Sequence, residues 1–218
     1  MRITHEFRKT AVVLTFLLLG LLACSGQPES DFVELVDVIP DVVLDIRYAT
    51  ENNFVGEVLY PSARCFLMRE PALALAKVQD DLKSRGYQLK VYDGYRPLSV
   101  QKRMWEILPD SRYVADPATG SMHNRGYSVD VALLDSAGNE LLMPTPFDDF
   151  TEAARQDNMD LPEDAIRHRA ILRTAMEKQG FSIIDTEWWH YNYRGARDKP
   201  VLDVSLDDLV AAQKSIKK

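Results

Sequence analysis

After about residue 31, apolar residues recur with two different periods, and these periods predict a mixture of helices and strands. In residues 70–85, Leu75, Val78 and Leu82 are spaced three or four positions apart and form one apolar stripe, and Gly86 follows as a typical helix end. This pattern predicts an amphipathic helix. Two further segments are expected to be helical: 99–108 and 164–179.

Alternation with a period of two is clearest in residues 127–134. Tyr127, Val129, Val131 and Leu133 alternate with smaller or polar residues, and this predicts a strand with Asp130 on its less apolar face. Further strands are expected over 42–48, 88–92, 141–143, 181–184 and 188–193. Helices and strands follow one another without strict alternation, which predicts an α+β fold with a small antiparallel sheet flanked by helices.

Residues 144–162 are mostly polar and irregular, and a loop of this length is often functional. The loop contains Asp148 and the neighbouring Asp149. The helix predicted after it carries His168 between two arginines, and this charged surrounding favours an exposed position on the helix.

The first 23 residues have a different character from the rest. A basic start is followed by an apolar run over 11–23, which is typical of a signal peptide and short for a membrane span. The run ends at Cys24 in a pattern that resembles a bacterial lipobox, in which the cysteine is lipidated. We therefore expect a lipoprotein signal peptide over 1–23, a tether over 24–31 and a single domain over 32–218. A plain signal peptide or an uncleaved anchor is the alternative.

Composition limits the partners and the compartment. The chain has 218 residues and a formal net charge of −7, which suits one globular domain and argues against nucleic acid or an anionic membrane as a direct partner. Membrane contact is expected only through lipid at Cys24, on an exported protein of the bacterial cell envelope. The only other cysteine, Cys65, would then have no intramolecular disulfide partner, and we expect it to be a small buried residue. The sequence does not indicate an oligomeric state.

Candidate chemistry is concentrated in residues 121–130 and 187–190. His123, Asp130 and His190 offer two imidazoles and a carboxylate, and three protein ligands with one open position are typical of catalytic zinc. Glu187 lies three residues before His190 and can take a proton from a zinc-bound water, whose pKa zinc lowers to about 7. The pattern predicts one Zn²⁺ per chain.

The spacing of these residues requires bends in the chain. His123 and Asp130 are seven residues apart, and Glu187 and His190 are three apart. On a regular strand an odd offset places two side chains on opposite faces. Both segments are therefore expected to bend, and Gly126 is a plausible bulge or turn in the first.

The patterns S-x-H-x-x-G-x-x-x-D at 121–130 and E-x-W-H at 187–190 resemble the signature of the zinc D-Ala-D-Ala peptidases. The chain is most similar to their D-alanyl-D-alanine dipeptidase branch, the VanX-like enzymes. The resemblance runs from residues 47–50 to Tyr191 and includes 93–97 and 147–148. It implies a small α+β fold of the D-Ala-D-Ala peptidase/hedgehog-like type with zinc held on the sheet. The implied reaction is zinc-dependent hydrolysis of the dipeptide D-Ala-D-Ala.

The resemblance also implies roles for individual residues. Glu187 would activate the water and later protonate the leaving amine, and Arg96 would stabilise the oxyanion of the tetrahedral intermediate. Ser121 and Asp148 would hold the free amino terminus of the substrate. From the residues alone, Arg96 could instead be an exposed loop arginine. Asp148 could face solvent, with Asp149 as its competitor.

Two alternative functions remain at this point. The first is a zinc D,D- or L,D-carboxypeptidase or endopeptidase that trims peptidoglycan stem peptides, which would suit a protein anchored in the cell envelope. The second is a zinc-loaded binding module without turnover, which could dispense with Glu187 and Arg96. Both residues are present, which argues against the binding module. We therefore expect a dipeptidase whose partner is a small dipeptide substrate.

Overall fold

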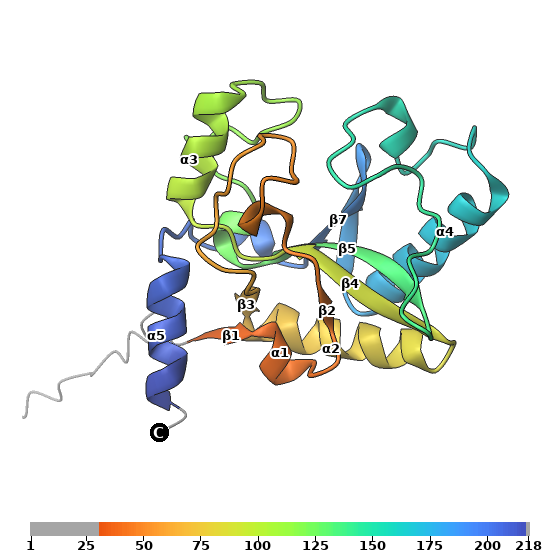
Figure 1. The fold of residues 1–218 in the computed structure, drawn as a ribbon, viewed down its shortest axis with the longest axis horizontal. Coiled ribbons are helices and arrows are strands. Elements are labelled where there is room, and N and C mark those ends of the chain that lie inside the picture. Colours follow the sequence, from red (N-terminus) through yellow and green to blue (C-terminus); the bar gives the residue numbers. More distant parts are fainter. Residues whose placement is uncertain (1–30, 217–218) are drawn as a thin grey trace, which may run out of the picture.

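The computed structural model describes residues 31–216 (Figure 1). The predicted signal peptide, Cys24 and residues 24–30 of the predicted tether lie outside the described residues. The strands are β1 (Phe32–Glu34), β2 (Val43–Leu44), β3 (Phe66–Met68), β4 (Tyr87–Asp93), β5 (Ser128–Asp135), β6 (Phe181–Ile184) and β7 (Glu187–Tyr193). The helices are α1 (Leu35–Val38), α2 (Arg69–Lys83), α3 (Leu98–Ile107), α4 (Glu163–Lys178) and α5 (Leu206–Ile216).

A five-stranded sheet forms the centre of the described residues, in the order β2-β4-β5-β7-β6. All its pairs are antiparallel except the short edge pair of β2 with β4, and β1 with β3 forms a separate antiparallel pair. The predicted α+β class is confirmed. None of the described helices has the length and hydropathy needed to span a bilayer.

The helix α2 forms where the apolar stripe predicted it. Leu75, Val78 and Leu82 are all fully buried, and this burial provides the main driving force for docking the helix. The helix contacts β4 and α4, and α4 in turn contacts β6 (Figure 1). The side chain of Gln79 accepts a hydrogen bond from the backbone N–H of Leu89, at 2.8 Å, which fixes α2 against β4.

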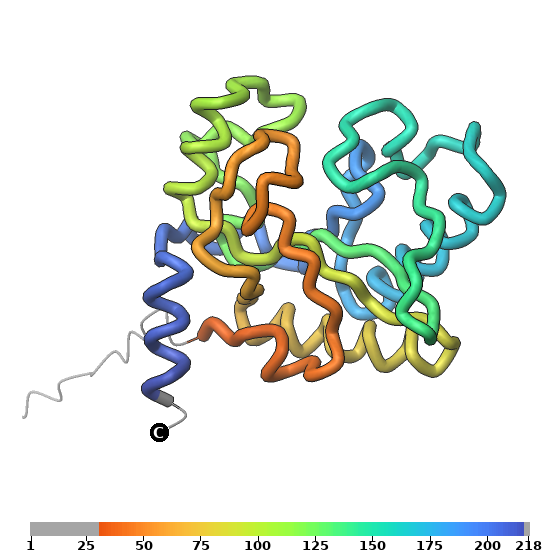
Figure 2. The backbone as a smooth tube through the Cα atoms, in the orientation of Figure 1, coloured from red at the N-terminus to blue at the C-terminus, as the bar shows by residue number. Residues whose placement is uncertain are grey.

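Two irregular regions lie on the side of the central sheet away from α2 (Figure 1). Figure 2 shows the segment around residues 50–60 beside α3 on one side, and the segment around 144–160 on the other. The second region contains little regular structure apart from the 3₁₀ helix Glu152–Ala154, as the sequence predicted for 144–162. Side chains from both regions line the site described below.

Two predicted strands differ from the structure. The strand expected over 42–48 is only Val43–Leu44, because the chain turns into the 3₁₀ helix Arg47–Ala49, which buries Tyr48. The strand expected over 141–143 is absent from the described residues, where pairing reduces to one bridge between Leu134 and Glu140. Side-chain contacts described below hold this segment instead.

Four elements were not expected: β1, α1, β3 and the longer helix α5. The first three are too short to show a periodic pattern. The last, α5, lies beside β1, and Gln213 donates a hydrogen bond of 3.0 Å to the backbone oxygen of Phe32 (Figure 1). Cys65 is buried as expected, at 2% exposure.

Candidate active site

Strand pairing brings two carboxylates and one imidazole into one row across the sheet. Asp130 on β5 is the direct partner of His190 on β7. On the other side of β5, the β4 register shifts between Val91 and Asp93, so that Asp93 is opposite Asp130. The row therefore results from the backbone register of three neighbouring strands.

His123 reaches this row from a turn that precedes β5. It begins the 3₁₀ helix His123–Arg125, which ends at Gly126 with a φ of 69°, in the left-handed region that favours glycine. A Cβ at position 126 would lie 2.8 Å from Cε1 of Phe32, so the site also lacks room for a side chain. The turn predicted at Gly126 is confirmed, and it brings His123 to Asp130 despite their odd spacing.

The donor atoms of His123, Asp130 and His190 form a small triangle. His123 Nε2 lies 3.1 Å from His190 Nδ1 and 3.3 Å from Asp130 Oδ1, and the third side is 3.0 Å. Ligand atoms at about 2.0–2.1 Å from a tetrahedral zinc ion lie roughly 3.3–3.4 Å apart. All three residues are buried. The donor set and its spacing therefore fit a zinc ion.

The remaining nitrogen of each imidazole has a partner that fixes the ring. His123 Nδ1 donates to the backbone oxygen of Gly94 at 2.7 Å. His190 Nε2 lies 2.9 Å from Oδ1 of Asn192, which also accepts from the hydroxyl of Ser128. These bonds leave His123 Nε2 and His190 Nδ1 free to face a metal, and such outer partners usually orient metal-binding histidines.

Glu187 begins β7 and lies beside the triangle. Its Oε2 is 4.0 Å from His190 Nδ1. The pairing of β6 with β7 shifts register between Ile183 and Ile184, and Glu187 lies at this irregularity, so the bend expected between Glu187 and His190 is present. Burial raises the pKa of Glu187; His190 opposes the shift and Asp130 adds to it. A carboxyl group with a raised pKa is a better proton carrier near neutral pH.

Arg96 is buried at 8% exposure, so it is not an exposed loop arginine. Asp93 accepts hydrogen bonds from its Nη2 at 2.7 Å and its Nε at 3.2 Å, and Gln101 accepts from Nη1 at 2.9 Å. The guanidinium carbon also lies 5.0 Å from the centre of the Tyr48 ring. Burial alone would lower the pKa of Arg96, but Asp93 and its other neighbours raise it, and the group stays charged.

A cavity of about 300 Å³ opens in front of these residues. Ser121 and Asp148 both line it. The Tyr48 hydroxyl donates to the two carboxylate oxygens of Asp148, at 3.1 and 3.2 Å. Asp149 instead accepts from the backbone N–H of Thr151 and does not line the cavity. Of the two competing aspartates, the one facing the cavity is Asp148.

The environment of Asp148 is unusual in two ways. Its φ of 61° is the one positive value of a non-glycine residue among residues 31–216. Non-glycine residues seldom adopt this backbone conformation, and those that do are concentrated at functional sites. Burial, reinforced by the charge of Asp130, raises the pKa of Asp148 well above its usual value, although Arg96 and Tyr48 oppose the shift. A cation that bound here would stabilise the ionised form.

Comparison with known proteins adds to this geometry. The model of the family described as D-ala-D-ala dipeptidase matches residues 28–208. The chain is 38% identical to a D-alanyl-D-alanine dipeptidase of Escherichia coli (strain K12) over 176 residues, 79% of this chain and 91% of that protein. It is 29% identical to one of Enterococcus faecalis over 184 residues, 75% of this chain and 91% of that protein.

The chain belongs to the D-Ala-D-Ala dipeptidase family. Members of this family are zinc metallopeptidases, and the triangle of His123, Asp130 and His190 is the cluster in residues 31–216 that could hold the ion. Among solved structures, the LD-carboxypeptidase LdcB has a TM-score of 0.46 and 21% identity, with 88% of this chain and 76% of that chain covered. The likeness to LdcB is too distant to support a functional comparison.

In this family member, the segment 141–148 is held against the sheet by side chains, and we call it the strap. Phe147 stacks on Tyr92, with ring centres 4.4 Å apart. The indole N–H of Trp188 donates to the Thr145 hydroxyl at 2.9 Å. Because Trp188 directly follows Glu187, this bond connects the strap that carries Asp148 to the strand that carries Glu187.

The strap also explains an expectation that was wrong. His168 is buried at 7% exposure, and its Nδ1 donates to the backbone oxygen of Leu142 at 2.9 Å. The strap covers this face of α4, and sequence periodicity could not show that a loop would do so. The neighbouring arginines gave the misleading impression of an exposed face.

Sequence reasoning assigned no role to three residues that hold the site together. They are Tyr48, Asp93 and Gln101. The first two lie within segments that carried the family resemblance, so their positions were marked although their partners were not. Gln101 had no such signal, because its contact with Arg96 depends on how α3 is placed.

Proposed function

We propose that this protein hydrolyses the free dipeptide D-Ala-D-Ala with one zinc ion per chain. The environment of Asp148 is the observation that supports a free dipeptide as the substrate. Its carboxylate faces the cavity, accepts only from the Tyr48 hydroxyl, and forms no ion pair within residues 31–216. A free ammonium group is a suitable partner for such a carboxylate, because a charge-assisted hydrogen bond would form.

His123, Asp130 and His190 would hold the zinc. A bound zinc ion lowers the pKa of a water molecule to about 7 and polarises a carbonyl oxygen. The task of the protein is then to move a proton, and Glu187 is our candidate because of its raised pKa and its position beside His190. It would accept the proton of the attacking water and deliver it to the leaving amine.

Arg96 would stabilise the negative charge that develops on the carbonyl oxygen. Asp93 and Gln101 occupy three of its five N–H groups. One N–H on each terminal nitrogen is therefore left for an oxyanion, since a guanidinium has five donors in all. Because its partners already fix the fork, little reorganisation would be needed during the reaction. In this role Asp93 is a positioning residue.

Substrate length would be selected at the amino end. Asp148, with Ser121 nearby in the same cavity, would bind the ammonium of a dipeptide. An N-acylated substrate lacks that charge and would leave the carboxylate without its partner. Sites built around such a polar contact can reject the analogue that lacks it by roughly 10,000-fold.

The test compares D-Ala-D-Ala with N-acetyl-D-Ala-D-Ala on zinc-loaded enzyme. We expect the wild type to cleave the free dipeptide and ignore the acetylated one. Asp148→Ala should lose activity on the dipeptide and narrow this gap, whereas Asp149→Ala, the matched control, should behave as the wild type. Equal cleavage of both substrates by the wild type would contradict the proposal and favour the carboxypeptidase function.

We further propose that the protein is exported and anchored by lipid at Cys24, with residues 1–23 removed. The support is the sequence pattern alone. Membrane fractionation tests this: the wild type should sediment with membranes, and Cys24→Ser should be released or remain unprocessed. Fractionation of a processed Cys24→Ser variant with membranes would contradict a lipid anchor at this residue.

A further inference from the structure

A second hollow adjoins the cavity in front of the metal ligands and shares part of its wall. This hollow has a volume of about 370 Å³ and lies along β6, β7 and the 3₁₀ helix Ala196–Asp198. Four residues line both spaces: Met122, Ile184, Asn192 and Arg197. The second hollow does not include Asp148, Tyr48 or Arg96. The wall that the two spaces share therefore does not include the proposed ammonium site.

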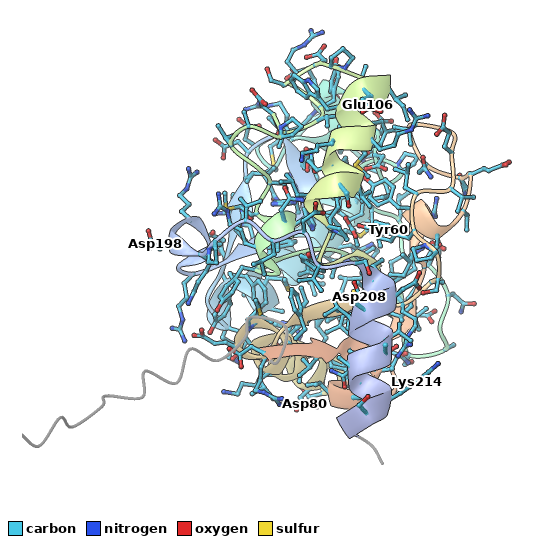
Figure 3. All side chains as sticks on the ribbon, turned by 90° about the vertical axis from the view of Figure 1, so that its left-hand side faces the viewer. Tyr60, Asp80, Glu106, Asp198, Asp208 and Lys214 are labelled. Carbon is cyan, nitrogen blue, oxygen red and sulfur yellow. The ribbon has the colours of Figure 1, made fainter. Side chains whose placement is uncertain are left out.

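Arg197 lies at this junction with an exposed side chain. In residues 31–216 no carboxylate forms an ion pair with it, although Asp198 follows it in the chain. Figure 3 shows Asp198, the neighbour of Arg197 in the chain, at the edge of the molecule in this view. The guanidinium of Arg197 is thus available to an anion that enters the cavity.

The other two arginines that line the cavity are already occupied. Arg96 is held by Asp93 and Gln101. Arg112 is bound to Asp110 by its Nε and Nη2 groups. Among the cavity residues that the structure describes, Arg197 is therefore the arginine whose charge is not matched by a carboxylate of the protein.

A free dipeptide has an ammonium at one end and a carboxylate at the other. Asp148 and Arg197 both line the cavity, with the metal ligands also in its wall, and of these two residues it is Arg197 that also lines the second hollow. A substrate lying between them would match both of its charges and present its peptide bond to the metal ligands. Without Arg197, the substrate carboxylate would meet a cavity that also contains Asp130, Asp148 and Glu187.

We propose that Arg197 binds the free C-terminal carboxylate of the dipeptide substrate. This inference rests on the proposed dipeptidase function and names the residue that recognises the second end of the substrate. A guanidinium is well suited to the task, since its planar fork matches the two oxygens of a carboxylate. The contact is at the rim, so its contribution should lie at the low end for charged hydrogen bonds, on the order of tenfold in kcat/KM.

The experiment varies the enzyme and the substrate together. The wild type, Arg197→Ala and the control Arg112→Ala are assayed with D-Ala-D-Ala and with its C-terminal amide, which lacks the negative charge. We expect Arg197→Ala to lose about tenfold in kcat/KM on the free acid and little on the amide. The preference for the acid should therefore shrink by about the same factor, while Arg112→Ala keeps it.

Zinc content and the near-ultraviolet circular dichroism spectrum of each variant show whether the folded site is intact. If Arg197→Ala loses activity equally on the acid and the amide, or keeps the full preference for the acid, the inference is overturned while the dipeptidase function stands. If the zinc-loaded wild type cleaves neither substrate, both proposals fail. Arg197→Lys should recover part of the preference, because it keeps the charge without the fork.

Discussion

The candidate metal ligands His123, Asp130 and His190, which we call the ligand row, and the strap 141–148 face the same cavity but are held in different ways. Backbone pairing across β4, β5 and β7 aligns Asp130 with His190 and Asp93. The backbone of the strap donates one hydrogen bond to the sheet, from Leu141 to the carbonyl of Leu133, and the strap is otherwise held by side chains, including Trp188 on Thr145 and Phe147 on Tyr92. The first region is specified by cooperative hydrogen bonding, and the second by a few separate contacts.

This difference indicates a division of labour. A site that must hold a metal needs ligand positions fixed within a fraction of an ångström, and a sheet centre provides them. A site that selects substrates by their amino end can be changed without disturbing the sheet, if it lies on a loop. We therefore expect substitutions in the ligand row to abolish the chemistry and substitutions in the strap to alter substrate selection.

The largest effect should follow His123→Ala. Loss of one of three ligands should remove both the zinc and the activity, because two ligands do not form a stable catalytic site. Metal analysis of the purified protein, together with turnover of D-Ala-D-Ala, measures this. His168→Ala is the matched control, a buried histidine outside the ligand row that should keep its zinc. A His123→Ala protein with one tightly bound zinc would exclude His123 as a ligand.

Glu187→Gln separates proton transfer from metal binding. The amide has nearly the same shape but cannot accept a proton, so kcat should fall about 100- to 10,000-fold while zinc stays bound. Single-turnover kinetics with a parallel zinc measurement distinguish the two effects. Turnover close to that of the wild type would mean that another group is the base.

Arg96→Ala should lower kcat by about 100- to 1,000-fold, with a smaller change in KM, because the charge that Arg96 meets develops in the transition state. Arg96→Lys should recover only part of the rate, since Asp93 and Gln101 are arranged around a planar fork. A change confined to KM would instead make Arg96 an anchor for the ground-state substrate.

The smallest effect is expected in the strap. Thr145→Val removes the hydroxyl that accepts from Trp188, and the loss of one neutral hydrogen bond should raise KM for D-Ala-D-Ala by about 2- to 10-fold. Discrimination against N-acetyl-D-Ala-D-Ala should weaken with it, while zinc binding stays unchanged. Thr145→Ser keeps the hydroxyl and should restore both values. Loss of zinc from Thr145→Val would show that the strap and the ligand row are not independent.

The same difference explains what the sequence could predict. Strand alternation and the two motifs indicated that His123, Asp130, His190 and Glu187 would converge, and the structure brings them together. Local patterns also located α2, α4 and β5 to within one or two residues. These elements are long enough for their periodicity to reflect the environment in which they are buried.

The features that the sequence could not predict depend on contacts between distant segments. The register shift at Asp93 is visible only once β4 is paired with β5. The burial of His168 depends on the strap, and the early end of β2 on the turn that buries Tyr48. None of these has a repeating pattern, so local propensity gave no indication of them.

The pairing of Asp130 with His190 has a consequence for how the chain folds. Side chains alternate along a strand, so a slip of one residue between β5 and β7 would turn one of the two away from the other. A slipped sheet could therefore not bind zinc through both residues. Because a ligand stabilises only the state that binds it, zinc would favour the correct alignment of β5 and β7 over alignments shifted by one residue. The ion would therefore help to select the native strand register before it takes part in any reaction.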